Sequence, residues 1–363
     1  MPRLEVDLSK LHHNARTLVD RLAGKGIGVT GVTKVALGNP AIARVLLRAG
    51  VAFIGDSRIE NIQRMRKAGV AGKYILLRTP LMSQVEQVVL HADISFNTEL
   101  AVIESLNQAA GRNNKVHQIV LMVELGDLRE GVHPQDLVAT ARRILKYPHI
   151  RLSGLGANLA CFGGIKPDVE KMAALSGLVH RINRSFNLRL EMVSGGNSAN
   201  LDWVFSGADA GAINNLRLGE SIFLGCETLE RKPIEGLHQD AVTLVAEVIE
   251  ANVKPSIPSG QVCQTAFGAP PVFVDRGKTR RAILGMGRQD VAISGLTSLT
   301  EGHVILGGSS DHLIVDCQQA PLRVGDEVRF GMNYEALLTA MTSPHVTKDL
   351  RYLGEVKAAG IVA

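Results

Sequence analysis

Lys34 is the residue whose surroundings most strongly suggest covalent chemistry. It follows the apolar run Ile27 to Val32. Burial at the end of such a strand lowers the pKa of an amine, and the neutral amine can attack a carbonyl carbon to form an imine. The alternative is a lysine that lies along the rim of the fold with its ammonium in water.

A second candidate is the segment Ser194, Gly195, Gly196, Asn197 and Ser198. Glycines let backbone N–H groups approach a ligand, and the two hydroxyls and the amide add further donors, so the segment predicts a phosphate-binding loop. Read alone, a Gly-Gly-Asn sequence is more often an ordinary loop. Together, an amine and a phosphate loop match pyridoxal phosphate (PLP), whose aldehyde needs an amine and whose phosphate needs an anchor.

Eight short apolar runs, separated by segments of helical length such as 40–49 and 136–145, predict the elements that position these groups. The runs are Ile27–Val32, Val51–Ile54, Tyr74–Leu77, Ile94–Phe96, Ile119–Val123, Ile150–Ala157, Leu190–Val193 and Ile213–Leu216. Alternation of buried strands with crossover helices is typical of a parallel sheet, and eight such units predict an α/β fold with a TIM (β/α)8 barrel over residues 7–228.

Polar side chains follow the predicted strands, at the face where such barrels carry their sites. They are Lys34, Asp56, Arg78, Asn97, Arg129, Asn158, Ser194 and Arg217. For any single residue the alternative is simple: strands end where apolar sequence ends, so a polar residue follows in any case.

After Arg231 the sequence changes to short β-type runs broken by turns, such as Ala241–Val245, Ala282–Leu284 and Leu313–Val315. This pattern predicts a mostly-β C-terminal domain over residues 229–363. Residues 1–6 come before the first predicted helix. We expect that they can pair with the C-terminal β domain.

Composition narrows the classes of function. No apolar run approaches the roughly 18 residues of a membrane helix, and the first 20 residues lack a signal peptide pattern, so we expect a cytoplasmic protein. The four cysteines lie far apart in the sequence, and this spacing predicts neither a disulfide nor a metal site. We therefore expect free thiols. The net charge of +5 comes from interspersed charges, 40 basic and 35 acidic, which does not indicate nucleic-acid binding.

Several longer strings resemble the alanine racemase superfamily of fold-type III PLP enzymes. The similar segments are Gly31–Asn39, Phe53–Arg58, Asp127–Gly131, Asn215–Gly225, Ser309–Asp316 and Asn333–Glu335. Together they span nearly the whole chain. The resemblance implies a racemase in which Lys34 binds the cofactor and then acts as a base at Cα.

The resemblance also implies roles for other residues. Arg129 would meet the substrate carboxylate and the cofactor's phenolic oxygen, and Arg217 would face the pyridine nitrogen. Tyr334 would bind the phosphate with the loop Ser194–Ser198, and Asn158 would lie beside the ring. Because a guanidinium does not release its proton there, Arg217 would keep the pyridine unprotonated. For Arg129 the alternative is an ion pair at the rim with Asp127 or Glu130.

Within the superfamily the chain most resembles ornithine racemases, through strings such as Val123–Gly131 and Gly287–Asp290. This implies a homodimer with sites shared across the interface, and conversion of L-ornithine to D-ornithine. A basic substrate needs a carboxylate for its second ammonium, and Asp290 and Asp311 are the first candidates. The alternatives are a racemase of lysine or arginine or of broader specificity, a decarboxylase or aldolase of the same cofactor class, and a non-catalytic PLP-handling protein.

Two positions depart from alanine racemase. Asn158 stands where that enzyme has a histidine, and Met286 falls about where it has its tyrosine base. Racemisation needs a proton donor on each face of a planar carbanion, so a second group must replace the tyrosine. The candidates are Asp290, Asp311, His312 and Cys161. Three of them also have a structural alternative: a turn cap for Asp290, a packed side chain for His312 and a buried thiol for Cys161.

Overall fold

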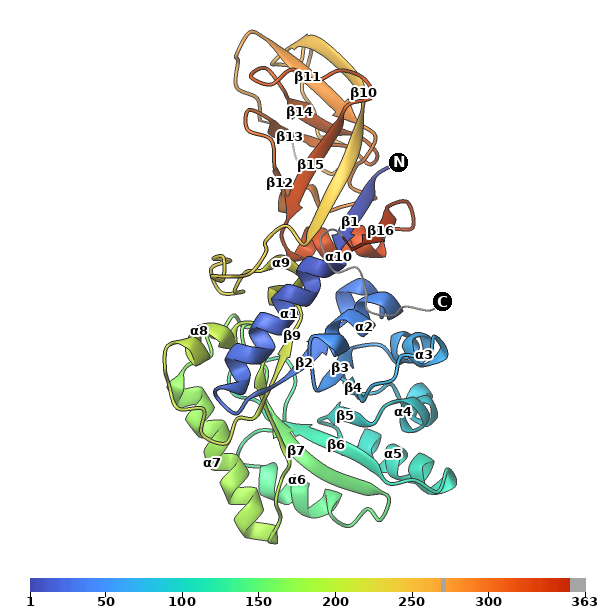
Figure 1. Ribbon diagram of the computed structural model, residues 1–363, viewed down its shortest axis with the longest axis vertical. Helices are drawn as coiled ribbons and strands as arrows, with labels where there is room; N and C mark the ends of the chain where they lie inside the picture. Colours follow the sequence, from blue (N-terminus) through green and yellow to red (C-terminus); the bar gives the residue numbers. More distant parts are fainter. Residues whose placement is uncertain (269–271, 353–363) are drawn as a thin grey trace. The chain divides into compact units, whose positions relative to one another are not determined.

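The computed structural model describes residues 1–268 and 272–352, and Figure 1 shows its central element, a closed barrel of eight parallel strands. The strands are β2 (Gly28–Val32), β3 (Phe53–Asp56), β4 (Tyr74–Leu76), β5 (Ile94–Asn97), β6 (His117–Met122), β7 (Ile150–Gly156), β8 (Met192–Gly196) and β9 (Asn215–Leu218). β2 pairs in parallel with both β3 and β9, which closes the ring. The predicted barrel is confirmed.

Helices alternate with the barrel strands and cover the outside of the ring (Figure 1). They are α1 (Leu8–Ala23), α2 (Pro40–Arg48), α3 (Ile59–Lys67), α4 (Val85–His91), α5 (Leu100–Arg112), α6 (Leu137–Ile144), α7 (Val169–Phe186), α8 (Asn200–Phe205) and α9 (Glu220–Leu224), with 3-10 turns at η1 (Lys34–Ala36) and η2 (Met82–Gln84). The start of α2 illustrates the local cause: the Asn39 side chain accepts hydrogen bonds from the first N–H groups, and Pro40 fixes φ in the first turn.

An apolar cluster lies inside the barrel. It consists of Ile75, Ile94, Phe96, Val120, Met122 and Met192, all less than a tenth exposed. Alternate residues of each strand point inward, as the period of two requires, so Ile94 and Phe96 enter this cluster from β5. Packing within this cluster supports the strands, at whose ends the predicted site residues lie.

The remaining described elements form an antiparallel sheet with one added parallel pair, which confirms the predicted β-rich domain. Its strands are β1 (Arg3–Asp7), β10 (Val242–Pro255), β11 (Lys278–Leu284), β12 (Leu296–Ser298), β13 (Val304–Gly308), β14 (Leu313–Asp316), β15 (Glu327–Met332) and β16 (Thr347–Arg351), with η3 (Ile293–Gly295) and α10 (Tyr334–Thr342). The main order is β12-β15-β10-β11-β14-β13. β1 pairs with β10 and, in parallel, with β16.

The chain divides into two compact units. The barrel unit is Lys10–Gln239, and the β unit combines Met1–Ser9 with the chain from Asp240 onward, of which 269–271 and 353–363 lie outside the described residues. The barrel unit thus extends past the predicted boundary at 228, because the chain after α9 folds back on it. Asn14 of α1 holds this return, since its Nδ2 donates to the Ile222 carbonyl at 3.0 Å and its Oδ1 accepts from the His238 N–H at 2.7 Å.

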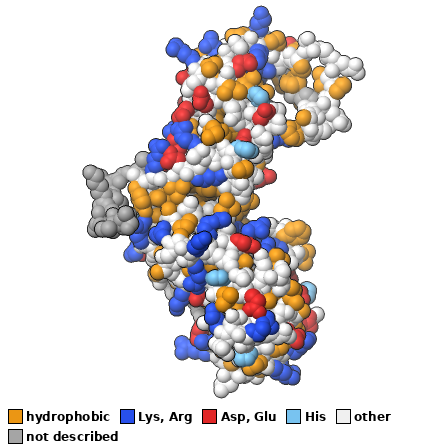
Figure 2. Space-filling view, turned by 90° about the vertical axis from the view of Figure 1, so that its right-hand side faces the viewer, with side chains coloured by type: hydrophobic (Ala, Val, Ile, Leu, Met, Phe, Trp, Pro, Cys, Tyr) orange, Lys and Arg blue, Asp and Glu red, His pale blue; other side chains and the backbone are white. Residues whose placement is uncertain are grey.

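The surface is mixed in charge. Figure 2 shows basic and acidic side chains scattered over the visible face. Within residues 1–268 and 272–352 no helix is long and apolar enough to cross a membrane. The same part of the chain contains no group of three His, Cys, Asp or Glu side chains arranged to hold a metal ion.

Candidate active site

Lys34 begins the turn η1 directly after β2, at the carboxyl end of the barrel. Thr33 anchors this turn to the next strand, because its N–H donates to the Gly55 carbonyl at 2.9 Å. The Lys34 side chain reaches solvent at the barrel mouth, yet the pKa of its amine is lowered. The largest cause is desolvation by the surrounding strand ends, and the positive charges of Arg129 and Arg217 add to it. A lowered pKa increases the share of neutral, nucleophilic amine.

Asp56, at the end of β3, organises the turn that carries Lys34. Its fully buried carboxylate accepts hydrogen bonds from the Thr33 hydroxyl at 2.9 Å, Asn61 Nδ2 at 2.9 Å and the Arg58 N–H at 3.0 Å. Desolvation nevertheless raises the pKa of this carboxyl group. These bonds connect two neighbouring strand ends and fix where the lysine emerges.

Arg217 lies inside the carboxyl end of the barrel and is 6% exposed. Its Nη1 donates to Ser194 Oγ at 2.6 Å, and its Nη2 donates to the Ala157 carbonyl and to Asn158 Oδ1, both at 2.9 Å. The guanidinium also stands over the Phe96 ring, 5.3 Å from its centre. Burial lowers the pKa of Arg217 to about 10, so the group remains a cation at neutral pH. All of these hydrogen-bond acceptors are neutral, which leaves the positive charge available to a ligand.

Asp127 joins two loops at the barrel mouth. Its buried carboxylate accepts from the backbone N–H groups of residues 161–163, at 3.1 to 3.2 Å. This clamp brings Cys161 to Arg129, whose Nη1 donates to Sγ at 2.7 Å. Arg129 also forms an ion pair with Glu130. This is the rim contact that the sequence offered as the alternative to substrate binding. Because both side chains are partly exposed, the pair contributes little stability and a ligand carboxylate can compete for the arginine.

The glycine-rich segment Ser194–Ser198, which begins within β8 and continues past its end, separates into two parts. Ser194 is completely buried, and its hydroxyl is used by Arg217 and Asn215. Ser198 lies further along, with its Oγ 3.0 Å from the Ser221 Oγ of α9. This pair of buried hydroxyls lies between the starts of two helices and is suited to an anion. The sequence reasoning missed Ser221, although its position four residues after Arg217 could have signalled it.

Gly196 shows why glycine occupies this loop. It has φ of +153°, and a Cβ there would lie 2.0 Å from Asn200 Oδ1. That oxygen accepts the Asn197 N–H at 3.0 Å and so holds the loop closed. A side chain at Gly196 would break the contact on which the loop conformation depends.

Asn158 carries an unused donor at the barrel mouth. Its Oδ1 accepts from Arg217 at 2.9 Å and from Asn197 Nδ2 at 3.2 Å. Its Nδ2 is buried and has no hydrogen-bond partner in the described structure. Buried donors without partners are rare in native proteins, and an acceptor atom of a bound ligand would satisfy this one.

The other predicted residues belong to the β unit. Asp290 is 4% exposed and accepts the Gly287 N–H at 3.0 Å, which makes it a turn cap. Asp311 is exposed and accepts from His312 Nδ1 at 2.8 Å. Tyr334 is the first residue of α10, and Met286 is fully buried. The structure therefore brings Asp311 and His312 together, and gathers Lys34, Cys161, Arg129, Asn158 and Arg217 in the barrel unit.

The barrel matches a known protein family. Residues 6–226 fit the family model described as alanine racemase, N-terminal domain. The chain belongs to this family. Similarity to two relatives extends beyond the family domain over nearly the whole chain. The chain is 40% identical to an ornithine racemase of Acetoanaerobium sticklandii, over 96% of this chain and 99% of that protein. It is 38% identical to a lysine racemase of Thermotoga maritima, over 96% and 98%.

Solved structures of the family have the same fold. An alanine racemase from Bartonella henselae with covalently bound pyridoxal phosphate superposes with a TM-score of 0.72 at 18% identity, over 96% of this chain and 99% of that one. At this level of identity the likeness shows the fold alone.

Proposed function

We propose that this family member is a PLP-dependent racemase of a basic amino acid, with ornithine as the first candidate substrate and lysine as the second. The observation that carries the proposal is an amine of lowered pKa, Lys34, in the same barrel mouth as a buried arginine, Arg217, whose partners are all neutral. The full-length similarity to an ornithine racemase and a lysine racemase supports the substrate class.

The residues at the barrel mouth fit the cofactor. Lys34 would hold its aldehyde carbon, and Ser198 and Ser221 would hold its phosphate, together with Tyr334 as the family resemblance implies. The unpartnered Nδ2 of Asn158 offers a donor to an acceptor atom of the ligand. When bound, the cofactor accepts electron density from Cα and so lowers the energy of removing the Cα proton.

Three further roles would fall to Lys34, Arg129 and Arg217: transfer of the Cα proton, binding of the substrate carboxylate and control of the ring nitrogen. Lys34, once its amine is free, takes the Cα proton, and its lowered pKa increases the fraction that can act as a base at neutral pH. Arg129 exchanges its contact with Glu130 for the substrate carboxylate and orients Cα. Arg217 keeps its own proton, because its pKa of about 10 lies well above neutrality. Arg217 would therefore leave a cofactor ring nitrogen unprotonated, which would favour return of the proton to Cα over transamination.

A second group must serve the opposite face of Cα. Cys161 lies in the barrel unit beside Arg129, and its thiol accepts a hydrogen bond from that cation. Asp290 is already engaged as a turn cap, whereas the Asp311–His312 pair is exposed and would be supplied by the second subunit of a homodimer. Cα deuterium exchange from each enantiomer, in Asn, Gln or Ser variants of these four residues, identifies the group whose loss abolishes inversion.

The second ammonium of a basic substrate would be recognised by Asp311. This carboxylate is exposed, and the pKa of its group is lowered by hydrogen bonds from His312 and Ser310 and by the charge of His312, so it is ionised at neutral pH. Asp290 is the weaker candidate because its buried carboxylate already accepts the Gly287 N–H. In this arrangement the β unit of one subunit completes the barrel site of the other.

The test is a chiral chromatography panel in which the PLP-loaded protein is incubated with L-ornithine, L-lysine, L-arginine and L-alanine. We expect inversion of ornithine or lysine to exceed that of alanine by at least about tenfold. Asp311→Asn should lower activity on the basic substrates more than on alanine, because alanine makes no use of that carboxylate. Putrescine from ornithine would show a decarboxylase instead, and cofactor binding without any turnover would show a carrier.

A further inference from the structure

A line of buried hydrogen bonds connects Arg217, through Asn215 at the amino end of β9, to the neighbouring strand β2. Arg217 Nη1 donates to Ser194 Oγ at 2.6 Å, Ser194 Oγ donates to Asn215 Oδ1 at 2.9 Å, and Asn215 Nδ2 donates to Thr30 Oγ1 at 2.9 Å. None of the four side chains is more than 6% exposed. We call this line the Arg217 chain.

The chemistry of the groups fixes the direction of the Arg217 chain. A guanidinium has donors and no acceptor, so the Ser194 oxygen must accept from it. The Ser194 hydrogen is then directed to Asn215 Oδ1, which leaves the Asn215 amide hydrogens for Thr30. Every donor therefore points away from the cation, and such aligned bonds polarise and strengthen one another in a buried setting.

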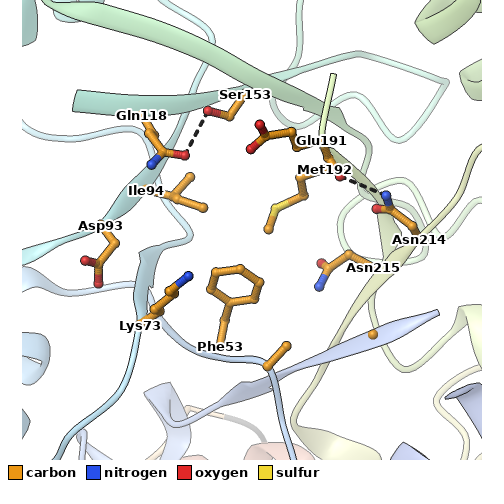
Figure 3. A pocket seen from close by; sticks show the side chains of 12 residues that line it. Phe53, Lys73, Asp93, Ile94, Gln118, Ser153, Glu191, Met192, Asn214 and Asn215 are labelled. Atoms are coloured by element: carbon orange, nitrogen blue, oxygen red, sulfur yellow. Dashed lines mark hydrogen bonds between the residues drawn. The ribbon is translucent and has the colours of Figure 1, made fainter. Parts of the chain in front are cut away.

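One member of the Arg217 chain, Asn215, borders a hollow at the amino end of the barrel. Asn215 lines this pocket of about 360 Å³ together with Phe53, Met192 and Ser153, and Figure 3 shows its amide directed towards the pocket from one wall. The chain of bonds thus runs from the pocket side to the barrel mouth. It reaches the catalytic face through Ser194, a residue of the glycine-rich segment.

We propose that Ser194 and Asn215 are positioning residues that hold the Arg217 guanidinium in place, and that Ser194 is not a phosphate ligand. The Ser194 hydroxyl has one hydrogen, and it is already given to Asn215. Donating it to a phosphate would leave Asn215 Oδ1 buried without a partner, which is costly. The phosphate role then falls to Ser198 and Ser221. This inference rests on the proposed function, since it assigns parts of the same site.

The first test is cofactor binding, read from the chain's single tryptophan. Trp203 is 3% exposed and lies in α8, five residues after Ser198, so quenching of its fluorescence reports cofactor added to the apoprotein. We expect Ser194→Ala to change the Kd for pyridoxal phosphate by less than about threefold, and Ser198→Ala to weaken it by about tenfold or more. The matched control is Ser153→Ala, which removes another buried barrel hydroxyl, one that donates to Gln118 at 3.0 Å.

The second test is the fate of substrate in the loaded variants. Ser194→Ala should lower kcat by about ten- to a hundredfold, the range for losing one hydrogen bond to a charged group, and should raise the share of turnovers ending in pyridoxamine phosphate. Thr30→Val, which keeps the shape but lacks the hydroxyl, should show a smaller loss in the same direction. Thr30→Ser should restore both kcat and product partition.

These tests distinguish a failure of the positioning role of Ser194 from a failure of the proposed racemase function. If Ser194→Ala weakens cofactor binding as much as Ser198→Ala, or leaves kcat and partition unchanged, the positioning role is wrong. The Thr30 pair guards against simple misfolding, because Ser and Val variants that both fold but behave identically would also overturn it. If the wild-type protein neither binds pyridoxal phosphate nor inverts any amino acid, the proposed function itself has failed.

Discussion

The two ends of the barrel differ in how their charges are held. At the amino end a hollow is lined by Phe53, Ile94 and Met192, with charged side chains around it (Figure 3). There Asp93 and Glu191 are exposed and paired with arginines of the surface, Arg66 at 2.9 Å in the first case and Arg151 in the second. Hydrated, paired charges of this kind do little for stability and are not prepared for a ligand.

The carboxyl end differs in three of its polar groups. Arg217 is buried among neutral acceptors, Lys34 has a lowered pKa, and Asn158 has a donor without a partner. A site is therefore indicated by a buried cation with only neutral hydrogen-bond acceptors, a desolvated amine and a buried donor without a partner, more than by the size of a hollow.

The largest expected effect tests this contrast with two lysines. Lys34→Ala should abolish turnover, by more than about a thousandfold, together with the visible absorbance of lysine-bound cofactor, because the base and the attachment point are lost at once. Lys73→Ala, the matched change at the amino end, should leave both within about twofold. Chiral chromatography and absorbance spectra measure the two effects, and a Lys34 variant that kept both would refute the assignment.

A second variant tests the role of the buried cation. Arg217→Glu should retain pyridoxal phosphate but lose about a hundredfold in racemisation, and it should accumulate pyridoxamine phosphate during turnover, because a carboxylic acid can protonate the ring nitrogen. Arg217→Gln, which is neutral, should lose rate with less accumulation. If both variants partition as the wild type does, Arg217 does not face the ring nitrogen.

At the amino end, a buried histidine should affect stability instead of turnover. His117 begins β6, is 3% exposed and contacts Ser95 Oγ through Nε2 at 2.8 Å. Burial lowers the pKa of His117 to about 4, below its ordinary value of 6.5. The unfolded chain therefore binds the proton more readily, and stability is lost as pH falls from 6.5 towards 4.

That loss should reach about 2 kcal/mol between pH 7 and pH 5. Urea unfolding at the two pH values measures it, and His117→Gln should remove this part of the pH dependence while the activity at pH 7 changes little. An unchanged difference between the two pH values in the variant would show that other groups cause the acid sensitivity.

The smallest effect is expected from the exposed pair at the amino end. Glu191→Gln breaks the ion pair with Arg151, and we expect a change in the free energy of unfolding below about 0.5 kcal/mol and no change in turnover. A loss above about 2 kcal/mol, or a marked change in kcat, would mean that the amino end participates in function after all.

The barrel was predictable because parallel strands are buried on both faces. Their apolar runs stand out in sequence, and strands such as β2 and β7 begin and end within one residue of the predicted ranges. Short strands of the β unit lack this signal. β16 reads Thr-Lys-Asp-Leu-Arg and is partly exposed, so it was not recognised, and its pairing with β1 depends on contacts between the two ends of the chain.

Side-chain direction at the site was the harder part. Strand exits pointed to Lys34, Arg129 and Arg217, but the sequence did not reveal that Ser194 is bonded to the Arg217 guanidinium within the barrel. The register of β8 against β9 shifts between Ser194 and Gly196, an irregularity that changes which residues face which side. The clamp made by Asp127 was missed for a similar reason, since it depends on a contact between two loops.

The parallel pairing of β1 with β16 has a consequence for how the protein is made. Arg3 lies opposite Thr347 in this register, so β1 leaves the ribosome well before the strand with which it pairs. At typical rates of synthesis, roughly 20 to 70 seconds separate the two. The barrel unit, Lys10–Gln239, is continuous and can fold in that interval, while the β1 backbone waits for its partner. During this time the segment is open to wrong pairing with other chains, and a bulky N-terminal fusion would act on assembly of the β unit rather than on the barrel.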